Sequence, residues 1–200
     1  MLGLGYVILF FLYWLIIKWG VTYVVKWAKR SNRSSIVWGG VAAILMLSIV
    51  FWDLIPVYGT HQYQCINNGG FTVYKTLDQW RDENPGVAET LVAVNGKSSV
   101  IGDTVRYQLN QRFAWDNTNS QVWYTLYKKE ENIVDIKTGE ILAKNIDFYT
   151  NIKNLMTGRN HKLRDFKVWM KIDSCESGNH YYESMKLNDF LSEIKELGKG

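Results

Sequence analysis

Two long runs of apolar residues open the chain, at residues 2–25 and 36–57. Each exceeds the ~20 residues that an α-helix needs to cross about 30 Å of hydrocarbon. No basic segment precedes the first run and no A-x-A-like site follows it, which favours a retained helix over a cleaved signal peptide. Residues 1–58 are therefore predicted to form a transmembrane helical hairpin with a connection at 26–35.

The rest of the chain, residues 59–200, mixes polar and apolar positions. Alternating apolar residues predict strands, among them one at 122–126 after a turn-rich segment at 116–120, and a last strand that includes 166–170. Apolar residues at helical spacing predict a C-terminal helix at 187–197. We expect an α+β domain, mainly an antiparallel sheet with short helices.

Local signals add detail to this domain. A first hairpin is predicted from strands at 61–66 and 71–75 around Asn-Asn-Gly-Gly, and a second around Lys-Thr-Gly at 137–139. The motif Thr76-x-x-Gln79 predicts a capping box at the start of a short helix. An Asn-Pro-Gly sequence then predicts the end of that helix.

The net charge of +4 belongs to the predicted anchor alone. Five basic residues and one acid precede residue 60, so the remaining 18 residues of each sign balance. A basic nucleic-acid-binding face is thereby excluded as the source of the charge. Four of the basic residues lie in the connection 26–35, and the positive-inside rule places such a loop in the cytoplasm. For a bacterium this predicts a multi-pass inner-membrane protein whose N-terminus and C-terminal domain are periplasmic.

The two cysteines, Cys65 and Cys175, lie near opposite ends of the domain. In an oxidising compartment they are predicted to form a disulfide. The alternative is a zinc site, because His61 and His180 lie near the cysteines in sequence and Cys₂His₂ is a known zinc ligand set. The spacing lacks a zinc-finger signature, so we expect no cofactor.

Lys18 and Asp53 are charges inside the predicted spans, where ionisable residues are functional suspects. Their distances from the connection differ, so they are not predicted to pair. Either Lys18 snorkels towards the headgroups while Asp53 lies in the outer interface, or Lys18 contacts an acid of a partner subunit.

A basic run lies between residues 153 and 171, where Asp165 is the one acid. Its basic residues are Lys153, Arg159, Lys162, Arg164, Lys167 and Lys171. The run is either a solvated loop leading into the last strand or a patch for anionic lipid headgroups or an acidic partner surface. Lys167 and Lys171 would share one face of that strand.

No catalytic motif is present: the sequence lacks G-x-S-x-G, H-E-x-x-H and a Gly-rich phosphate loop. We therefore predict a non-enzymatic, inner-membrane-anchored periplasmic interaction module, an accessory subunit or binding partner of an envelope or membrane complex. Its expected partners are the lipid bilayer and a protein, with no nucleic acid. The alternatives are a membrane-tethered periplasmic hydrolase or metal-dependent enzyme, and an immunity- or exclusion-type membrane protein.

Overall fold

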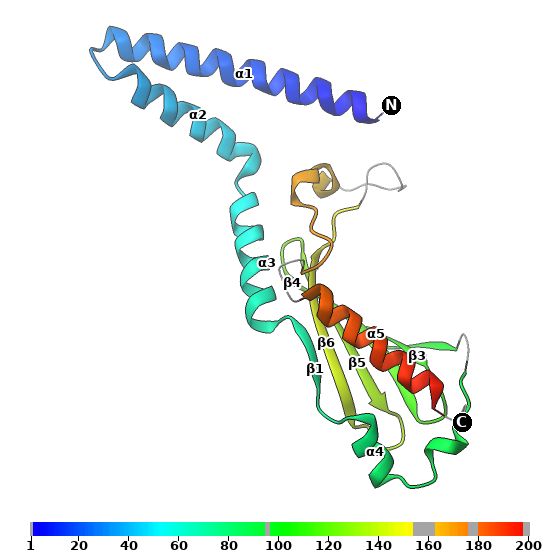
Figure 1. Cartoon of the computed structure of the whole chain (residues 1–200). Helices are drawn as coiled ribbons and strands as arrows, with labels where there is room; N and C mark the ends of the chain where they lie inside the picture. Colours follow the sequence, from blue (N-terminus) through cyan, green and yellow to red (C-terminus); the bar gives the residue numbers. More distant parts are fainter. Residues whose placement is uncertain (1, 95–96, 154–162, 176–179, 198–200) are drawn as a thin grey trace. The chain divides into compact units, whose positions relative to one another are not determined.

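The computed structural model describes residues 2–94, 97–153, 163–175 and 180–197. Within these residues the chain forms five α-helices and one six-stranded antiparallel sheet (Figure 1), which confirms the predicted α+β class. The helices are α1 (Leu2–Arg30), α2 (Ser35–Phe51), α3 (Leu54–Asn68), α4 (Leu77–Glu83) and α5 (His180–Glu196). The strands are β1 (Gly70–Val73), β2 (Ser98–Ile101), β3 (Thr104–Gln108), β4 (Phe113–Trp123), β5 (Leu126–Asp135) and β6 (Ile141–Thr150). The 3₁₀ helices are η1 (Ala88–Thr90), η2 (Leu163–Phe166) and η3 (Val168–Met170).

The chain divides into two compact units. The helical unit comprises residues 1–58 and 153–169, and the sheet domain comprises residues 59–152 and 170–200. The described residues 163–169 therefore belong with the apolar helices, although they follow β6 in the chain.

Small residues bring α1 and α2 of the helical unit into close contact. A Cβ atom added at Gly20 would lie 2.1 Å from the methyl carbon of Met46, and one added at Gly39 would lie 2.8 Å from a methyl of Val25. A larger side chain at Gly39 would press on the branched Val25, whereas at Gly20 the flexible end of Met46 would have to move. Glycine at such contacts is the usual device for close approach of membrane helices.

The second predicted span is not an unbroken helix. By length and composition α1 qualifies as a membrane anchor or a signal sequence, whereas α2 qualifies only together with α3, from which it is bent by 61°. The break falls at Trp52 and Asp53. Pro56 lies in the first turn of α3, where its missing N–H leaves no intrahelical bond unmade, so it helps to begin this helix and does not end the previous one.

The predicted strand at 61–66 is wrong, because α3 continues to Asn68. Val57, His61 and Cys65 are all buried, and their four-residue spacing places them on one face of a helix. The predicted first hairpin therefore does not form, and β1 pairs with β6.

The sheet has the strand order β1-β6-β5-β4-β3-β2. Its β5–β6 hairpin turns at Gly139, whose φ of 76° confirms the predicted glycine turn. The turn predicted at 116–120 is wrong, because β4 runs through these residues and the chain turns at Tyr124, with φ 46°. Turn-type side chains such as Asp116 instead face cross-strand partners, here Arg106 on β3.

The core of the domain lies between the sheet and helices α4 and α5. The predicted C-terminal helix is confirmed, and its buried face comprises Leu187, Phe190, Leu191, Ile194 and Leu197. These side chains form one cluster with Phe113 and Ile133 of the sheet and Trp80 of α4. The predicted capping box at Thr76 and Gln79 begins α4, with both reciprocal hydrogen bonds present.

A buried ion pair joins α4 to the end of β5. Asp135 accepts hydrogen bonds from Arg112 at 2.6 and 3.1 Å and from the indole N–H of Trp80 at 2.9 Å. Burial by itself would raise the pKa of the Asp135 carboxyl, but the bonds from Arg112, Trp80 and the Lys137 backbone outweigh it and hold the pKa below its ordinary value. The pair is therefore ionised at neutral pH, and both carboxylate oxygens of Asp135 accept hydrogen bonds.

Candidate functional site

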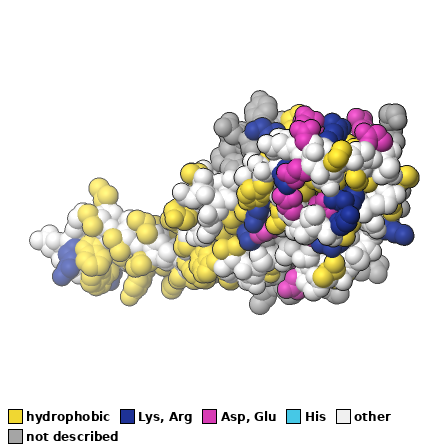
Figure 2. Space-filling model, turned by 90° about the horizontal axis from the view of Figure 1, so that it is seen from below, with side chains coloured by type: hydrophobic (Ala, Val, Ile, Leu, Met, Phe, Trp, Pro, Cys, Tyr) yellow, Lys and Arg dark blue, Asp and Glu magenta, His cyan; other side chains and the backbone are white. Residues whose placement is uncertain are grey.

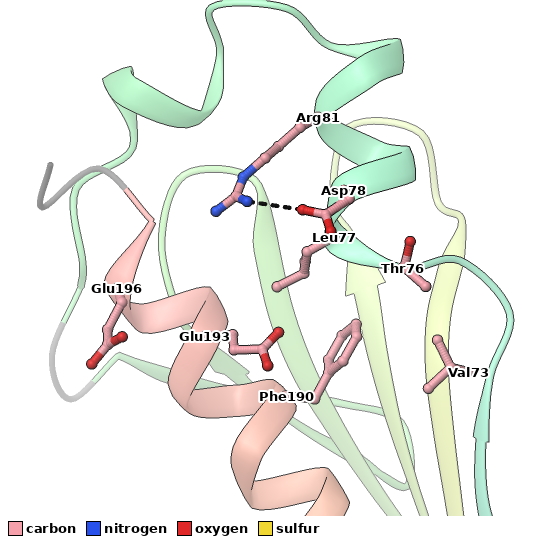
Figure 3. A pocket seen from close by; sticks show the side chains of 8 residues that line it. All are labelled: Val73, Thr76, Leu77, Asp78, Arg81, Phe190, Glu193 and Glu196. Carbon is pink, nitrogen blue, oxygen red and sulfur yellow. Dashed lines mark hydrogen bonds and ion pairs between the residues drawn. The ribbon is translucent and has the colours of Figure 1, made fainter.

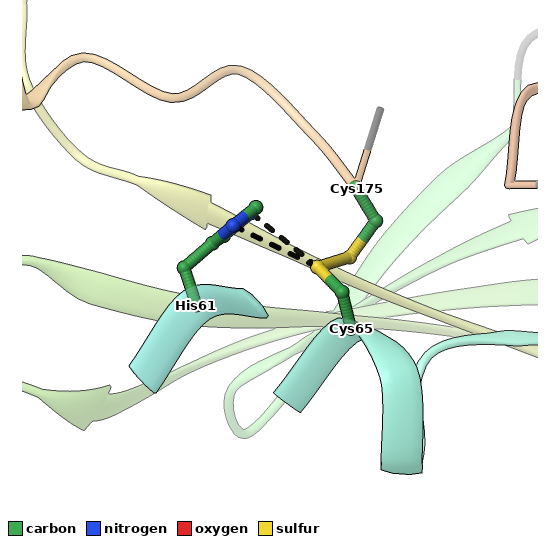
Figure 4. A group of neighbouring side chains, drawn as sticks. All are labelled: His61, Cys65 and Cys175. Carbon is green, nitrogen blue, oxygen red and sulfur yellow. Dashed lines mark hydrogen bonds between the residues drawn. A yellow bond between two sulfur atoms is a disulfide. The ribbon is translucent and has the colours of Figure 1, made fainter. Parts of the chain in front are cut away.

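His61, Cys65 and Cys175 meet beside the sheet (Figure 4). A disulfide joins the two cysteines, whose Cα atoms are 5.6 Å apart although 110 positions separate them in sequence. His61 and Cys65 lie one turn apart on α3, and the imidazole Nε2 is 3.4 Å from Cys65 Sγ. One potential ligand atom from each of the three residues lies within 4.8 Å of the others.

In this disulfide-bonded form neither sulfur is a thiolate, which is the state that zinc ligation or nucleophilic attack requires. Nε2 of His61 lies 3.0 Å from the carbonyl oxygen of Phe148, the distance of an N–H···O hydrogen bond. All three side chains are buried, and the disulfide packs against Leu126 and Phe148. The fourth residue of the zinc alternative, His180, begins α5, and its side chain lies outside the described residues. The arrangement fits a structural crosslink.

Asp53 is fully buried at the junction of α2 and α3. It forms an ion pair with Lys167, whose ammonium also lies 5.5 Å from the centre of the Trp52 ring. No local sequence pattern indicates this pair, because its members lie 114 positions apart. Lys18 is exposed on α1, 5.3 Å from the ring of Trp14, and its contact with a partner subunit stays a prediction.

The predicted basic patch is divided by the fold. Residues 163–170 form 3₁₀ turns, so the predicted last strand is wrong and Lys167 and Lys171 share no strand face. Lys171 pairs with Asp173 at 3.0 Å, and Lys153 is exposed. Within this segment Trp169 packs against Phe10 and Phe51 of the apolar helices. Arg159, Lys162 and the side chain of Arg164 lie outside what the structure describes.

A cleft of about 550 Å³ opens between α4 and α5 (Figure 3). Leu77 and Phe190 line it with buried apolar surface. Glu193 and Glu196 project from α5, while Asp78 and Arg81 of α4 form an ion pair at 3.0 Å. Because the one arginine already faces a carboxylate, the cleft presents an excess of negative charge. Sequence reasoning missed it, since its walls come from elements more than a hundred residues apart.

Ion pairs also cross the sheet. Glu130 lies between Lys128 and Lys144, each at 2.7 Å, and Arg106 binds Asp116 through two nitrogens. Burial would raise the pKa of Glu130, but hydrogen bonds from both lysines and from Asn132 lower it to about 2. In Figure 2, acidic and basic side chains gather on the domain, whereas hydrophobic side chains dominate the surface of the helical unit. Each of these charged side chains therefore lies beside one of opposite sign.

Among the tryptophans of the sheet domain, Trp80 is buried in the core and Trp115 packs against it. Trp123 is 40 % exposed.

Comparison with protein-family models, with characterised proteins and with solved structures found no match.

Proposed function

We propose that this protein is a membrane-anchored, non-enzymatic interaction module, with α1 and α2 embedded in a bilayer and the sheet domain outside it. The exposed apolar surface of α1 carries this proposal. Only 6 % of an 18-residue apolar stretch of α1 is buried. Val7, Ile16 and Trp19 of this helix are each more than half exposed.

Such a surface is unfavourable in water. Each Å² of apolar surface left in water forgoes about 25 cal/mol of transfer free energy, which hydrocarbon tails supply in a bilayer. The same reasoning covers α2, where Ile36 and Ile49 are 86 % and 73 % exposed. Single exposed apolar residues are common on soluble proteins. Two helices with apolar residues exposed along their length fit a lipid environment.

The proposed topology is that of a bacterial inner-membrane protein with its domain in the periplasm. Two observations support it. The connection between α1 and α2 is basic, as cytoplasmic loops are, and the domain carries a disulfide, which persists in oxidising compartments.

The proposed partner is a protein of an envelope or membrane complex that offers a basic segment to the cleft between α4 and α5. Lysine and arginine combine an aliphatic stem with a charged end. The stem matches the apolar floor at Leu77 and Phe190, and the charge matches Glu193 and Glu196. The enzyme and immunity alternatives have no specific structural observation in their favour.

Two measurements test the proposal. Alkaline extraction of membranes leaves an embedded protein in the pellet, so release of the full chain into the supernatant would refute the anchor. Partner binding is tested by co-purification after gentle solubilisation, comparing the wild type with Glu193→Lys. We expect the charge reversal to remove the bound protein, whereas Glu89→Lys, an exposed reversal in η1, retains it. Free monomer from wild-type membranes would contradict the binding role.

A further inference from the structure

The segment Leu163–Trp169, after β6, contacts the apolar helices of the helical unit. We propose that this segment is a second membrane-contact element, lying at the boundary between the lipid headgroups and acyl chains. The inference rests on the proposed bilayer placement of α1 and α2. It adds a lipid contact made by a part of the chain far from the anchor in sequence.

Trp169 supplies the first observation. Its ring packs edge-on against Phe10 of α1, with centroids 6.1 Å apart, and against Phe51 of α2 at 4.8 Å. Phe10 lies towards the start of α1 and Phe51 ends α2, so both lie at the end of the antiparallel pair opposite its connection. For a hairpin that spans a bilayer, this end is the second membrane surface.

Polar contacts fix the segment at the same end. Lys167 forms its ion pair with the buried Asp53, and the hydroxyl of Tyr58 donates a hydrogen bond of 3.2 Å to the carbonyl oxygen of Trp169. A buried carboxylate without a counter-charge is strongly unfavourable in a low-dielectric environment. Lys167 is therefore the residue that holds the segment against the junction of α2 and α3.

Among the side chains of the segment that the structure describes, the two most exposed are apolar. Phe166 and Val168 are 36 % and 47 % exposed, and the neighbouring Trp52 is 56 % exposed. Tryptophan is enriched where membrane meets water, because its ring combines an apolar body with a polar N–H. This apolar surface is continuous with the lipid-facing surface of the helices through Trp169 and Phe51, so the bilayer is the occupant that the structure favours.

Depth-dependent quenching of a fluorescent label tests the inference. The native cysteines form a disulfide, so an introduced cysteine is the one thiol available for an environment-sensitive dye. The full chain is reconstituted in phosphatidylcholine vesicles that carry a nitroxide quencher, placed either near the headgroup or deep in the acyl chain. Labels are placed at Val168→Cys in the segment, Ile44→Cys on the exposed face of α2 and Ser99→Cys in the exposed strand β2.

We expect the shallow quencher to quench the label at residue 168, the deep quencher to quench the label at residue 44, and neither to quench the label at residue 99. Quenching at 44 without quenching at 168 would overturn the inference and leave the anchor in place. No quenching at either position would refute the proposed function itself.

The role of Lys167 is tested in the same vesicles. Asp53→Asn removes its counter-charge, so we expect the label at 168 to lose shallow quenching. Asp173→Asn is the matched control, because it breaks the exposed pair with Lys171 and should leave the signal unchanged. Unchanged quenching at 44 shows that the helices remain inserted. Full quenching at 168 in Asp53→Asn would show that this ion pair does not hold the segment.

Discussion

Isoleucine side chains have opposite surroundings in the two units of this protein. In the helical unit Ile36 is 86 % exposed, whereas in the sheet domain Ile133 and Ile194 are fully buried. The same residue type therefore faces outward in one unit and inward in the other. The proposed bilayer placement explains the difference, because lipid would remove the advantage of burying apolar side chains. Close contact between the helices, as at Gly39, would then hold them together.

Charged side chains differ in a similar way. The sheet domain satisfies its buried charges in networks such as Asp135 with Arg112, whereas Asp53, a buried carboxylate of the helical unit, has its counter-ion in a distant part of the chain. The domain is thus stabilised by burial, ion pairs and a disulfide. Under the proposed function, the helical unit depends on a surrounding bilayer.

The largest effect is expected from removal of the disulfide. Cys65→Ala with Cys175→Ala opens a loop whose closure contributes about 4–5 kcal/mol in the chain-entropy model. Thermal unfolding of the full chain in detergent, followed by near-ultraviolet circular dichroism, should show a large loss of domain stability. Retention of the double variant in membranes should equal that of the wild type, and reduced retention would contradict the separation of the two units.

Next in size is Asp135→Ala, which leaves the guanidinium of Arg112 buried without its partner. Breaking such a pair costs about 3–5 kcal/mol. Asp78→Ala is the control, because it breaks the exposed pair with Arg81, which contributes at most about 1 kcal/mol. Urea unfolding of both variants should separate them clearly, and equal midpoints would show that the buried pair does not stabilise the domain.

A charge placed on an exposed apolar residue distinguishes the two surfaces directly. Ile16→Asp, at the middle of α1, should cost about 3 kcal/mol of membrane insertion. Val100→Asp, on the 75 % exposed strand β2, should change stability by less than about 0.5 kcal/mol. Alkaline extraction measures the first variant and urea unfolding the second. Full membrane retention of Ile16→Asp would mean that α1 does not face lipid.

The smallest effect concerns Glu130, whose pKa falls from an ordinary 4.5 to about 2 on folding. A lowered folded-state pKa stabilises the domain above the unfolded value, and this contribution disappears as the pH falls from 4.5 towards 2. For a partly exposed pair we expect about 1 kcal/mol or less. Wild type and Glu130→Gln should therefore differ in urea midpoint at pH 6 and converge in acid, and a constant difference would assign the effect to packing.

Features set by local sequence could be predicted. The capping box at Thr76, the glycine turn at Gly139 and the apolar face of α5 all depend on residues within a few positions of one another. The apolar character of α1 follows equally from its composition. In each case the residues that form the signal lie within the element itself.

Features set by distant contacts could not be predicted. Residues 61–66 alternate enough to resemble a strand, and the helical spacing of Val57, His61 and Cys65 emerges only once their buried face is known. Aspartate is a residue typical of turns. The partner that Asp116 has within the sheet, Arg106 on the neighbouring strand β3, is known only from the fold. The partner of Asp53 likewise depended on where Lys167 lies in the fold.

The order of the elements along the chain determines when the domain can fold during synthesis. The ribosome releases α1 and α2 first, whereas the domain core awaits Leu187–Leu197 and the disulfide awaits Cys175. Even β1 must wait for β6, because Gly70 pairs with Ile146. The domain therefore completes its folding only after residue 197 has been synthesised, later than α1 and α2. Until then its unpaired strands are exposed to aggregation.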